Sequence, residues 1–191
     1  LHHQNKTITA FGKDTPQTCI HNQLDYTSQI NIDEANEAYD MVLLHRRLSI
    51  IDLNASGHQP MCIDDGNIWI TFNGEIYNYI EIRKELQDKG CVFKSESDTE
   101  VVLYAYKIWG KKCLQKFNGM WAFVIFDKTK NILFGARDRF GVKPFYYYKD
   151  KDVFAFASEQ KALVKMPFIQ TGIRQEAVYD YFVKGEIEYE T

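Results

Sequence analysis

The chain has 191 residues, of which 15% are aromatic, and a formal net charge of −3 from 26 acidic and 23 basic side chains. This length is enough for one domain with a substantial core, and the composition is that of a globular protein. The near balance of charge excludes the basic surface of a protein that binds nucleic acid or an anionic membrane. No apolar run reaches the ~18 residues that a membrane-spanning helix requires.

The cysteines and the N-terminal residues indicate a reduced, metal-free protein. The cysteines at positions 19, 62, 91 and 113 are far apart and show no CxxC spacing. This favours free thiols of a cytoplasmic protein over a disulfide framework or a zinc site. Leu1-His2-His3 contains two adjacent histidines without cysteine or carboxylate support, so we predict no metal site. Nothing at the N-terminus resembles a signal peptide, and in the polar region 4–40 we predict exposed loop with short strands, such as Thr7–Phe11.

The first sharp pattern is the apolar run 41–44, which predicts a buried strand. It leads into His45-Arg46-Arg47-Leu48-Ser49-Ile50-Ile51-Asp52. For Arg46 we favour a solvent-exposed strand edge. Arg47 is instead a candidate ligand for a carboxylate, because a guanidinium at a strand end can donate two parallel hydrogen bonds to it. Gly57-His58-Gln59-Pro60 is predicted to turn the chain.

The segment that follows carries the strongest functional pattern. A strand over 67–70 and a helix beginning at Asn78 place Asn73-Gly74-Glu75 at a strand-to-helix turn. Gly74 allows a positive φ angle and a close approach of a ligand to the main chain. The Asn73 amide and a backbone N–H of such a turn can form an oxyanion hole. Taken alone, Asn-Gly is more typical of an ordinary β-hairpin turn.

A helix is predicted from Asn78 to Gly90. Glu81 lies three residues after Asn78, which is the spacing of a capping box. Ile80, Ile82 and Leu86 form its apolar stripe, and Gly90 closes its C-terminus. A short strand at 91–93 follows.

A second helix is predicted to begin at Ser97, with Glu100 as capping-box partner, and to end at Gly110. Its buried face is formed by Val101, Val102, Tyr104, Ala105 and Ile108. Asp98 then lies in the first turn. A carboxylate there either interacts favourably with the helix dipole or receives an ammonium group, and the residues alone leave both open.

From Gly119 onward the pattern predicts β-hairpins and short helices. The strand pairs are 120–126 with 132–136 and 145–148 with 153–157, and the charged loop 137–144 lies between them; helices are predicted over 159–165 and 174–184. Antiparallel strands around helices predict the α+β class with layered sheets.

Three of these features together suit an α-amino acid. Arg47 would bind its carboxylate, Asp98 its ammonium group, and the Asn73-Gly74-Glu75 segment its side-chain amide.

Seven segments, in order, resemble those of a known family. They are His45-Arg46-Arg47-Leu48-Ser49-Ile50-Ile51-Asp52-Leu53, Gly57-His58-Gln59-Pro60, Asn73-Gly74-Glu75-Ile76-Tyr77-Asn78, Ser97-Asp98-Thr99-Glu100, Asn118-Gly119-Met120-Trp121-Ala122-Phe123, Ala136-Arg137-Asp138-Arg139-Phe140-Gly141-Val142-Lys143-Pro144 and Ala157-Ser158-Glu159. Over about residues 41–190 the chain resembles the glutaminase domain of glutamine-hydrolysing asparagine synthetase, a class II glutamine amidotransferase domain.

The resemblance implies a four-layer αββα sandwich of two antiparallel sheets, the N-terminal-nucleophile hydrolase fold, which releases ammonia from glutamine. Arg47 would bind the glutamine α-carboxylate. Asn73 and Gly74 would form the oxyanion hole, Glu75 would hold the substrate amide and Asp98 the α-amino group. The same pocket would be lined by Leu48, Ser49, Ile50 and Ile51.

The chain also departs from the family. The family nucleophile is an N-terminal cysteine, and none of the four cysteines here is N-terminal. Gln4-Asn5-Lys6 stands where the family has an Arg-Gly-Pro-Asp loop. We therefore expect a single domain over 1–191 that lacks its first strand, one N-terminal loop and the C-terminal synthetase domain. Such a chain would bind glutamine poorly and hydrolyse none.

The resemblance implies no cofactor for the glutaminase domain; ATP and Mg²⁺ would belong to the synthetase domain of a parent enzyme that makes asparagine from aspartate. The expected partners are glutamine and that synthetase domain, without nucleic acid or membrane, and a homodimer is left open. Two alternatives also stay open. One is an amidotransferase with another acceptor, as in surface-polysaccharide or antibiotic synthesis. The other is a non-catalytic scaffold without the nucleophile, against which the retained amino-acid pocket argues.

Overall fold

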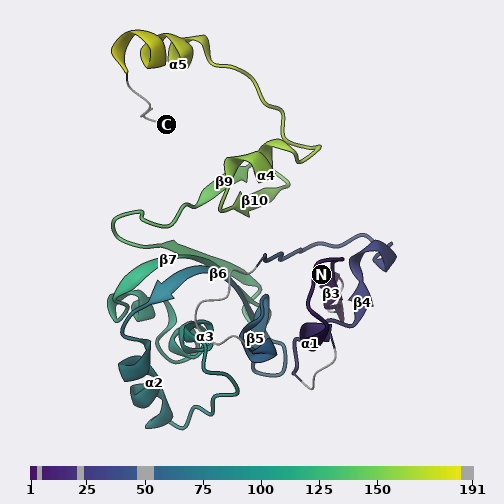
Figure 1. The fold of residues 1–191 in the computed structure, drawn as a ribbon, viewed down its shortest axis with the longest axis vertical. Coiled ribbons are helices and arrows are strands. Elements are labelled where there is room, and N and C mark those ends of the chain that lie inside the picture. The colour runs from purple at the N-terminus through teal and green to yellow at the C-terminus, as the bar shows by residue number, and fades with distance from the viewer. Residues whose placement is uncertain (4–5, 21–23, 47–53, 186–191) are drawn as a thin grey trace. The chain divides into compact units, whose positions relative to one another are not determined.

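The computed structural model describes residues 1–3, 6–20, 24–46 and 54–185 (Figure 1). The chain divides into two compact units, one over Leu1–Pro144 and one that begins at Phe145. In the described part of the chain no helix has the length and apolar character needed to cross a membrane.

The first unit is built on a four-stranded antiparallel sheet. Its order is β5 (Met61–Ile63), β6 (Ile68–Ile76), β7 (Gly119–Asp127) and β8 (Ile132–Arg137). β6 and β7 are rich in Ile, Trp, Phe and Val, which suit a buried pleated surface, and they pair along their whole length, from Ile68 opposite Asp127 to Ile76 opposite Gly119. β5 is much shorter and pairs only with the first part of β6, ending at Met61 opposite Ile70.

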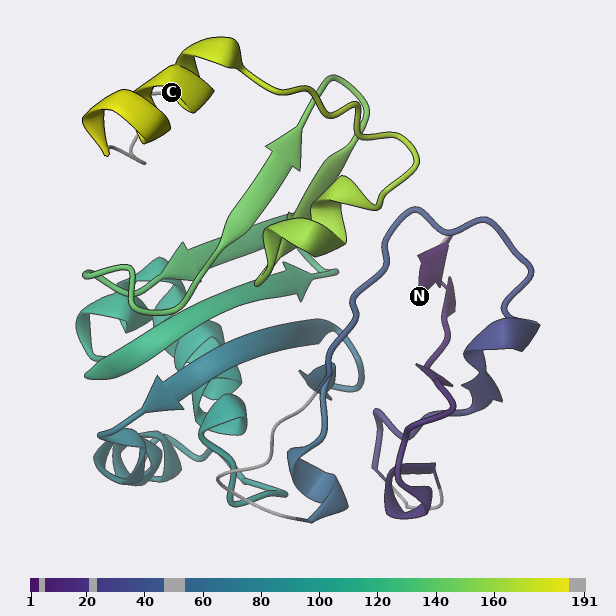
Figure 2. The ribbon, with the colours of Figure 1, turned by 45° about the horizontal axis from the view of Figure 1, so that its top comes forward.

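Two helices follow β6. α2 spans Tyr79–Gln87 and α3 spans Asp98–Trp109, after which the 3₁₀ helix η3 runs over Gly110–Gln115. α3 packs against β5 and β6, and α2 packs against α3 (Figures 1 and 2). Gly90 and Gly110 both adopt positive φ angles at the helix ends, as predicted.

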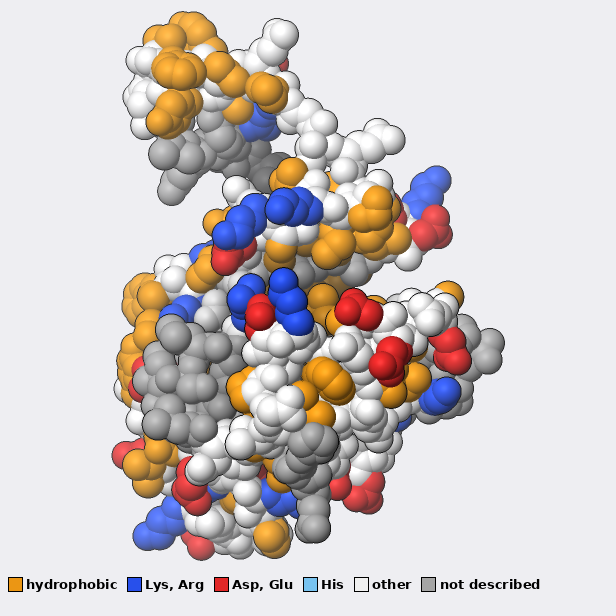
Figure 3. All heavy atoms as spheres, turned by 45° about the vertical axis from the view of Figure 1, so that its right-hand side comes forward, with side chains coloured by type: hydrophobic (Ala, Val, Ile, Leu, Met, Phe, Trp, Pro, Cys, Tyr) orange, Lys and Arg blue, Asp and Glu red, His pale blue; other side chains and the backbone are white. Residues whose placement is uncertain are grey.

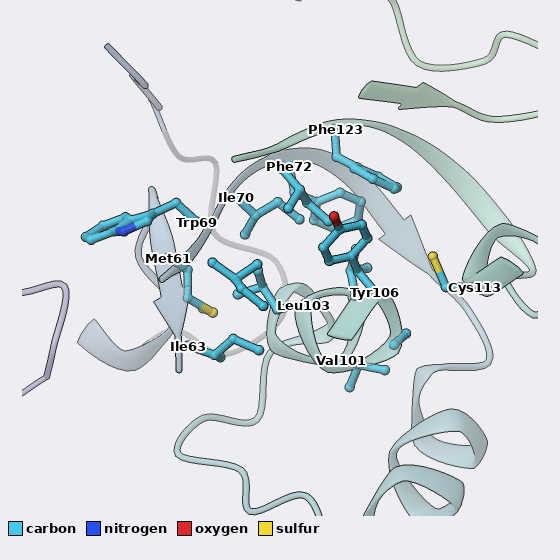
Figure 4. Close-up of a cluster of buried hydrophobic side chains, with 14 of the residues drawn as sticks. Met61, Ile63, Trp69, Ile70, Phe72, Val101, Leu103, Tyr106, Cys113 and Phe123 are labelled. Carbon is cyan, nitrogen blue, oxygen red and sulfur yellow. The ribbon is translucent and has the colours of Figure 1, made fainter. Parts of the chain in front are cut away.

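The main core lies between this sheet and α3 (Figure 4). Ile70 and Phe72 of β6, Phe123 of β7 and Leu103 of α3 are all buried. The Tyr106 hydroxyl donates a hydrogen bond to the fully buried carboxylate of Asp127 at 3.1 Å. Burying one such large apolar side chain stabilises the fold by about 1.5–3 kcal/mol, so this cluster holds the strand that carries the candidate site.

The opposite face of the sheet contacts the N-terminal segment. The rings of His2 and Phe126 lie 5.5 Å apart, and Lys128 Nζ donates to Thr7 Oγ1 at 3.2 Å. Phe126 and Asp127 are neighbours in β7 and so face opposite sides of the sheet. The small elements of this region are β1 (His2–His3), β2 (Lys6–Thr7), β3 (Ala10–Phe11), α1 (Gln17–Ile20), β4 (Ile30–Asn31), η1 (Ile32–Glu34) and η2 (Ala55–Gly57).

β1 and β2 form an antiparallel pair, whereas β3 and β4 are parallel. The predicted buried strand at 41–44 is wrong. Met41 forms only an isolated bridge with His2, and Val42 and Leu44 are exposed. The apolar run therefore has no long strand partner among the described residues. The predicted strand at 91–93 is also wrong, because this segment has no regular structure.

The second unit contains a hairpin and two short helical segments. β9 (Tyr146–Lys149) pairs antiparallel with β10 (Phe154–Ala157), as predicted. α4 covers Gln160–Val164, and α5 (Gln175–Tyr179) continues as the π-helical segment η4 (Asp180–Lys184). Hydrophobic side chains gather on the surface of this last helical segment (Figure 3), among them Tyr179, Tyr181 and Phe182.

The α+β class with antiparallel sheets is thus confirmed. One predicted helix start differs in detail. Asn78 is the N-cap of α2, but its side chain makes no capping hydrogen bond. Its Oδ1 instead accepts from the Asn118 N–H and its Nδ2 donates to the Lys116 carbonyl, both at 2.9 Å. The predicted capping box with Glu81 is wrong, because a tertiary contact takes the Asn78 amide.

Candidate active site

Asn73-Gly74-Glu75 lies inside strand β6, opposite Ala122, Trp121 and Met120 of β7. The predicted strand-to-helix turn is therefore wrong for these residues, and so is the alternative of a hairpin turn. The strand continues to Ile76 because β7 runs beside it to the end, and only then does the chain enter α2. Asn73 and Glu75, two residues apart, share one face of the sheet and are half-buried.

Gly74 is required by the close approach of β7. Its φ angle is +159°, positive as predicted but close to extended backbone. A Cβ at this position would overlap the Met120 carbonyl oxygen and lie 2.7 Å from the Trp121 Cα. Gly119 meets the same restriction from the other strand, against the Glu75 carbonyl oxygen. A side chain at either position would therefore collide with the main chain of the partner strand.

The free edge of β6 beyond β5 is bonded by side chains. Alternate residues of a strand direct their main-chain groups to opposite edges, and the even-numbered residues of β6 face β5. The Phe72 N–H donates to Gln59 Oε1 at 2.6 Å. The Ile76 N–H donates to Asp98 Oδ2 at 3.0 Å. Two side-chain oxygens thus occupy this edge on either side of one residue.

That residue is Gly74. Its N–H points to the same edge, between the bonded amides of Phe72 and Ile76, and no acceptor for it is found among the described residues. An unpaired main-chain N–H at a strand edge is a donor that a ligand oxygen can use. The Asn73 side chain is its immediate neighbour. The edge therefore offers the donor that the oxyanion-hole prediction needs, although from a strand rather than from a turn.

Asp98 is the buried carboxylate of this edge. It opens α3 and is 5% exposed. Burial raises the pKa of Asp98 to about 6, and the nearby negative charge of Glu75 raises it too, although hydrogen bonds from the main chain of Ile76 and Thr99 lower it. No cation among the described residues forms an ion pair with this carboxylate. A ligand ammonium group would stabilise its charged form.

The loop before α3 fixes Asp98 in place. Ser97 is the N-cap of the helix, as predicted, and its Oγ accepts from the Thr99 N–H at 3.1 Å. Glu100 does not complete the predicted capping box. Its buried carboxylate accepts instead from the Ser95 N–H at 2.7 Å and from the Ser95 hydroxyl at 2.6 Å. The first turn of α3 is therefore bonded to the loop on both sides of Asp98.

The structure brings together Asn73, Gly74, Glu75 and Asp98, because Asp98 bonds to the end of the strand that contains the other three. The predicted substrate ligands Arg47, Leu48, Ser49, Ile50 and Ile51 lie outside the described residues. All four cysteines are free. Burial raises the pKa of Cys62 and of Cys113 to about 12, so these thiols stay protonated and are poor nucleophiles.

Sequence reasoning missed two residues, Gln59 at this edge of β6 and Asp138 on the far side of β7. Gln59 was predicted only as part of a turn, and its signal was its place beside a proline, two residues before β5. Asp138 was predicted only as part of a charged loop. It is 5% exposed and accepts from the N–H of Val142 and of Lys143, both at 2.9 Å, and of Trp121 at 3.2 Å. It therefore fixes that loop to the strand opposite Gly74.

Comparison with known proteins identifies the class. The family model of the glutamine amidotransferase domain matches residues 21–190, so the chain belongs to this family. The predicted resemblance is thereby confirmed.

The particular relatives are asparagine synthetases. The chain is 51% identical over 119 residues to the glutamine-hydrolysing asparagine synthetase 1 of Bacillus subtilis, a match that covers 62% of this chain and 19% of the relative. It is 37% identical over 203 residues to the putative glutamine-hydrolysing asparagine synthetase 2 of Methanocaldococcus jannaschii, which covers 98% of this chain and 36% of the relative. The chain thus spans between a fifth and about a third of these relatives.

Solved structures support the fold. A glutamine phosphoribosylpyrophosphate amidotransferase from B. subtilis, in complex with ADP and GMP, matches with a TM-score of 0.53 and 25% identity, over 63% of this chain and 28% of that one. The allosteric regulatory enzyme of purine biosynthesis matches with a TM-score of 0.50 and 23% identity, over 62% of this chain and 28% of that one. The first of these neighbours is an amidotransferase, and the likeness of the fold to both confirms the predicted fold class.

Proposed function

We propose that the β6 edge is the glutamine site of a glutaminase, in which the substrate amide is hydrolysed to the γ-carboxylate of glutamate and ammonia. The observation that carries the proposal is the unpaired Gly74 N–H between two side chains that occupy the rest of the edge. One of them, Asp98, is a buried carboxylate without a cation partner among the described residues.

Each part of glutamine has a ligand in this proposal. The carboxylate of Asp98, at the start of α3, accepts hydrogen bonds from the α-ammonium group, and Glu75, on strand β6, holds the nitrogen of the side-chain amide. The predicted guanidinium of Arg47 binds the α-carboxylate. Leu48, Ser49, Ile50 and Ile51 line the same pocket. Burying a charged carboxylate is unfavourable unless a partner compensates its charge. In this proposal the α-ammonium group of glutamine is that partner for Asp98.

The chemistry uses the Gly74 N–H and the Asn73 side-chain amide as an oxyanion hole. When a nucleophile attacks the γ-carbonyl, the electron pair of the C=O bond moves to the oxygen, and the two donors stabilise the resulting negative charge. The C=O bond then re-forms as the C–N bond breaks, and the amide nitrogen takes up the proton of the nucleophile and leaves as ammonia. Water hydrolyses the resulting acyl intermediate, which gives the γ-carboxylate of glutamate and returns the nucleophile with its proton.

In the full-length protein we propose that the ammonia serves the synthesis of asparagine from aspartate. The names of the B. subtilis and M. jannaschii relatives support this acceptor. ATP and Mg²⁺ would then bind to a synthetase domain outside this chain, and that domain would be the principal partner. A cytoplasmic location is part of the same proposal, and a homodimer is left open.

The test is ammonia release from glutamine by the full-length protein and by its Asn73→Ala variant. Loss of one oxyanion donor is expected to lower kcat by about a hundredfold. The matched control is Asn67→Ala. Asn67 directly precedes β6, and its side-chain amide donates to the Asp64 carbonyl at 2.8 Å. This control is expected to keep its kcat within about twofold.

The outcomes separate the alternatives. A wild-type protein that binds no glutamine would support the scaffold and reject the glutaminase. Ammonia release without asparagine formation, in the presence of aspartate, ATP and Mg²⁺, would keep the glutaminase and reject the acceptor. Equal kcat values for Asn73→Ala and the wild type would remove Asn73 from the oxyanion hole.

A further inference from the structure

We propose that Gln59 is a positioning residue of this site, which sets the Gly74 donor and ties the turn that carries Asp98 to strand β6. The inference rests on the proposed glutaminase function. It adds a residue outside the predicted substrate ligands, and it explains why the edge of β6 is open at Gly74 and nowhere else between Phe72 and Ile76.

The Gln59 side chain takes the place of a strand residue. Its Oε1 accepts from the Phe72 N–H at 2.6 Å, and its Nε2 donates to the Phe72 carbonyl at 3.1 Å. These are the two hydrogen bonds that a residue opposite Phe72 would make in an antiparallel ladder. In the β5–β6 register, which pairs Met61 with Ile70, that opposite residue is position 59. Pro60 has no N–H, and a proline is typical of the end of a strand.

The replacement leaves the next donor free. A main-chain strand that continued past position 59 would also pair with Gly74. A single side-chain amide has one oxygen and two N–H groups, and here they are used by Phe72 and by one further residue. The amide therefore satisfies one position of the edge and ends there. The Gly74 N–H stays available for the oxygen of a substrate.

The further residue is Thr99 in the first turn of α3. Gln59 Nε2 lies 3.3 Å from Thr99 Oγ1, and Thr99 is 2% exposed. Thr99 directly follows Asp98. The Gln59 side chain thus connects two elements. It bonds to β6 at Phe72, two residues before the Gly74 donor, and to α3 at Thr99, one residue after the Asp98 carboxylate. The separation of the two substrate-binding groups depends on this connection.

Gln59 is itself held by the residue before it. The two ring nitrogens of His58 lie within hydrogen-bond distance of carbonyl oxygens, one of Ala55 and the other, at 3.0 Å, of Tyr26. The Tyr26 ring lies 4.7 Å from the His58 ring, and its hydroxyl donates to the Ser56 carbonyl at 2.6 Å. The turn that presents Gln59 is therefore anchored to the N-terminal segment of the same unit.

The main test is the steady-state kinetics of glutamine hydrolysis in the full-length protein with Gln59→Met. Methionine keeps most of the side-chain volume and removes all three hydrogen bonds. A displaced oxyanion donor mainly affects the transition state, so we expect kcat to fall about tenfold or more, with a smaller change in KM. The matched control is Gln87→Met, an exposed glutamine at the end of α2, for which both constants should stay at their wild-type values.

Variants of Thr99 separate the two roles of Gln59, which are to set the Gly74 donor and to tie the turn that carries Asp98 to β6. Thr99→Val removes only the connection to α3, so KM for glutamine is expected to rise about three- to tenfold while kcat is nearly unchanged. Thr99→Ser keeps the hydroxyl and should restore the wild-type KM. A residue that only stabilised the fold would produce neither the split between kcat and KM nor this rescue.

Gln59→Glu keeps the inference testable if the methionine variant does not fold. Glutamate still accepts from the Phe72 N–H but loses both donated bonds, and the same fall in kcat is expected. If both constants, corrected for the folded fraction, match the wild type in the variants that fold, the positioning role is wrong while the glutaminase stands. A wild-type protein that releases no ammonia would overturn the proposed function, and the role of Gln59 with it.

Discussion

The two halves of strand β6 have the same partner on one edge and different partners on the other. β7 pairs with all of Ile68–Ile76, but β5 reaches only as far as Ile70. The first half is buried throughout, whereas Asn73, Gly74 and Glu75 are half-buried. From Ile68 to Ile70 both edges of the strand are closed by main chain, and this part of the strand supports the core. In the second half side chains replace the main chain, and one N–H is left for a ligand.

The largest effect is expected at Gly74, which lies both against the main chain of β7 and in the candidate site. Gly74→Ala places a methyl group against the main chain of Met120 and Trp121. We expect the free energy of unfolding to fall by about 3 kcal/mol or more, and glutaminase kcat to fall by about a hundredfold or more as the donor moves. Denaturant unfolding and ammonia release measure the two. Gly12→Ala, with no atom within 4 Å of the added carbon, is the control, and a wild-type kcat for Gly74→Ala would exclude Gly74 as a donor.

A core substitution in the first half should affect stability alone. Ile70 is fully buried, at 0% exposure, so Ile70→Ala is expected to lower the free energy of unfolding by about 2–5 kcal/mol. KM for glutamine should not change at temperatures where the variant is folded. Ile132→Ala on β8, where the side chain is 43% exposed, should cost much less. A changed KM in folded Ile70→Ala would show that the two halves are not independent.

A substitution of Asp98, in the candidate site, should raise the free energy of unfolding rather than lower it. Because the pKa of Asp98 is higher in the folded protein than in the unfolded chain, its ionisation at neutral pH costs folding free energy. Asp98→Asn removes this cost, and we expect the unfolding free energy at pH 7 to rise by about 1–3 kcal/mol. Glutamine affinity should fall by about tenfold to a hundredfold, as calorimetry on the full-length protein would measure. The exposed Asp88→Asn is the control, and unchanged affinity in Asp98→Asn would remove Asp98 from the site.

The pH dependence is the smallest effect. With a pKa of about 6, Asp98 is charged at pH 7 and mostly protonated at pH 5. A protonated carboxyl group cannot pair with an ammonium ion, so glutamine affinity should fall by about tenfold between pH 7 and pH 5. In Asp98→Asn the same titration should be nearly flat over this interval. An equal pH dependence in both proteins would assign the titration to another group.

Much of the fold was predictable because its signals are local. The alternation of apolar residues located β7 and β8, and the glycines at positions 90 and 110 located the ends of α2 and α3. The two errors at helix starts have one cause in common. Asn78 and Glu100 carry capping residue types, but their side chains bond to Asn118 and Ser95 instead. Such competition between local and tertiary partners cannot be predicted from spacing along the chain.

The sequence by itself determined the class of the protein and the residue types of its site. An amide, a glycine and two carboxylates stand at positions 73, 74, 75 and 98, in segments that match one family. Only the tertiary structure decided that residues 73–75 lie in a strand, that the Gly74 N–H has no acceptor among the described residues, and that the Gln59 side chain bonds to the edge beside it. The physical reason is that a main-chain N–H is free or bonded according to the strand beside it. That partner is set by packing between segments far apart in the chain.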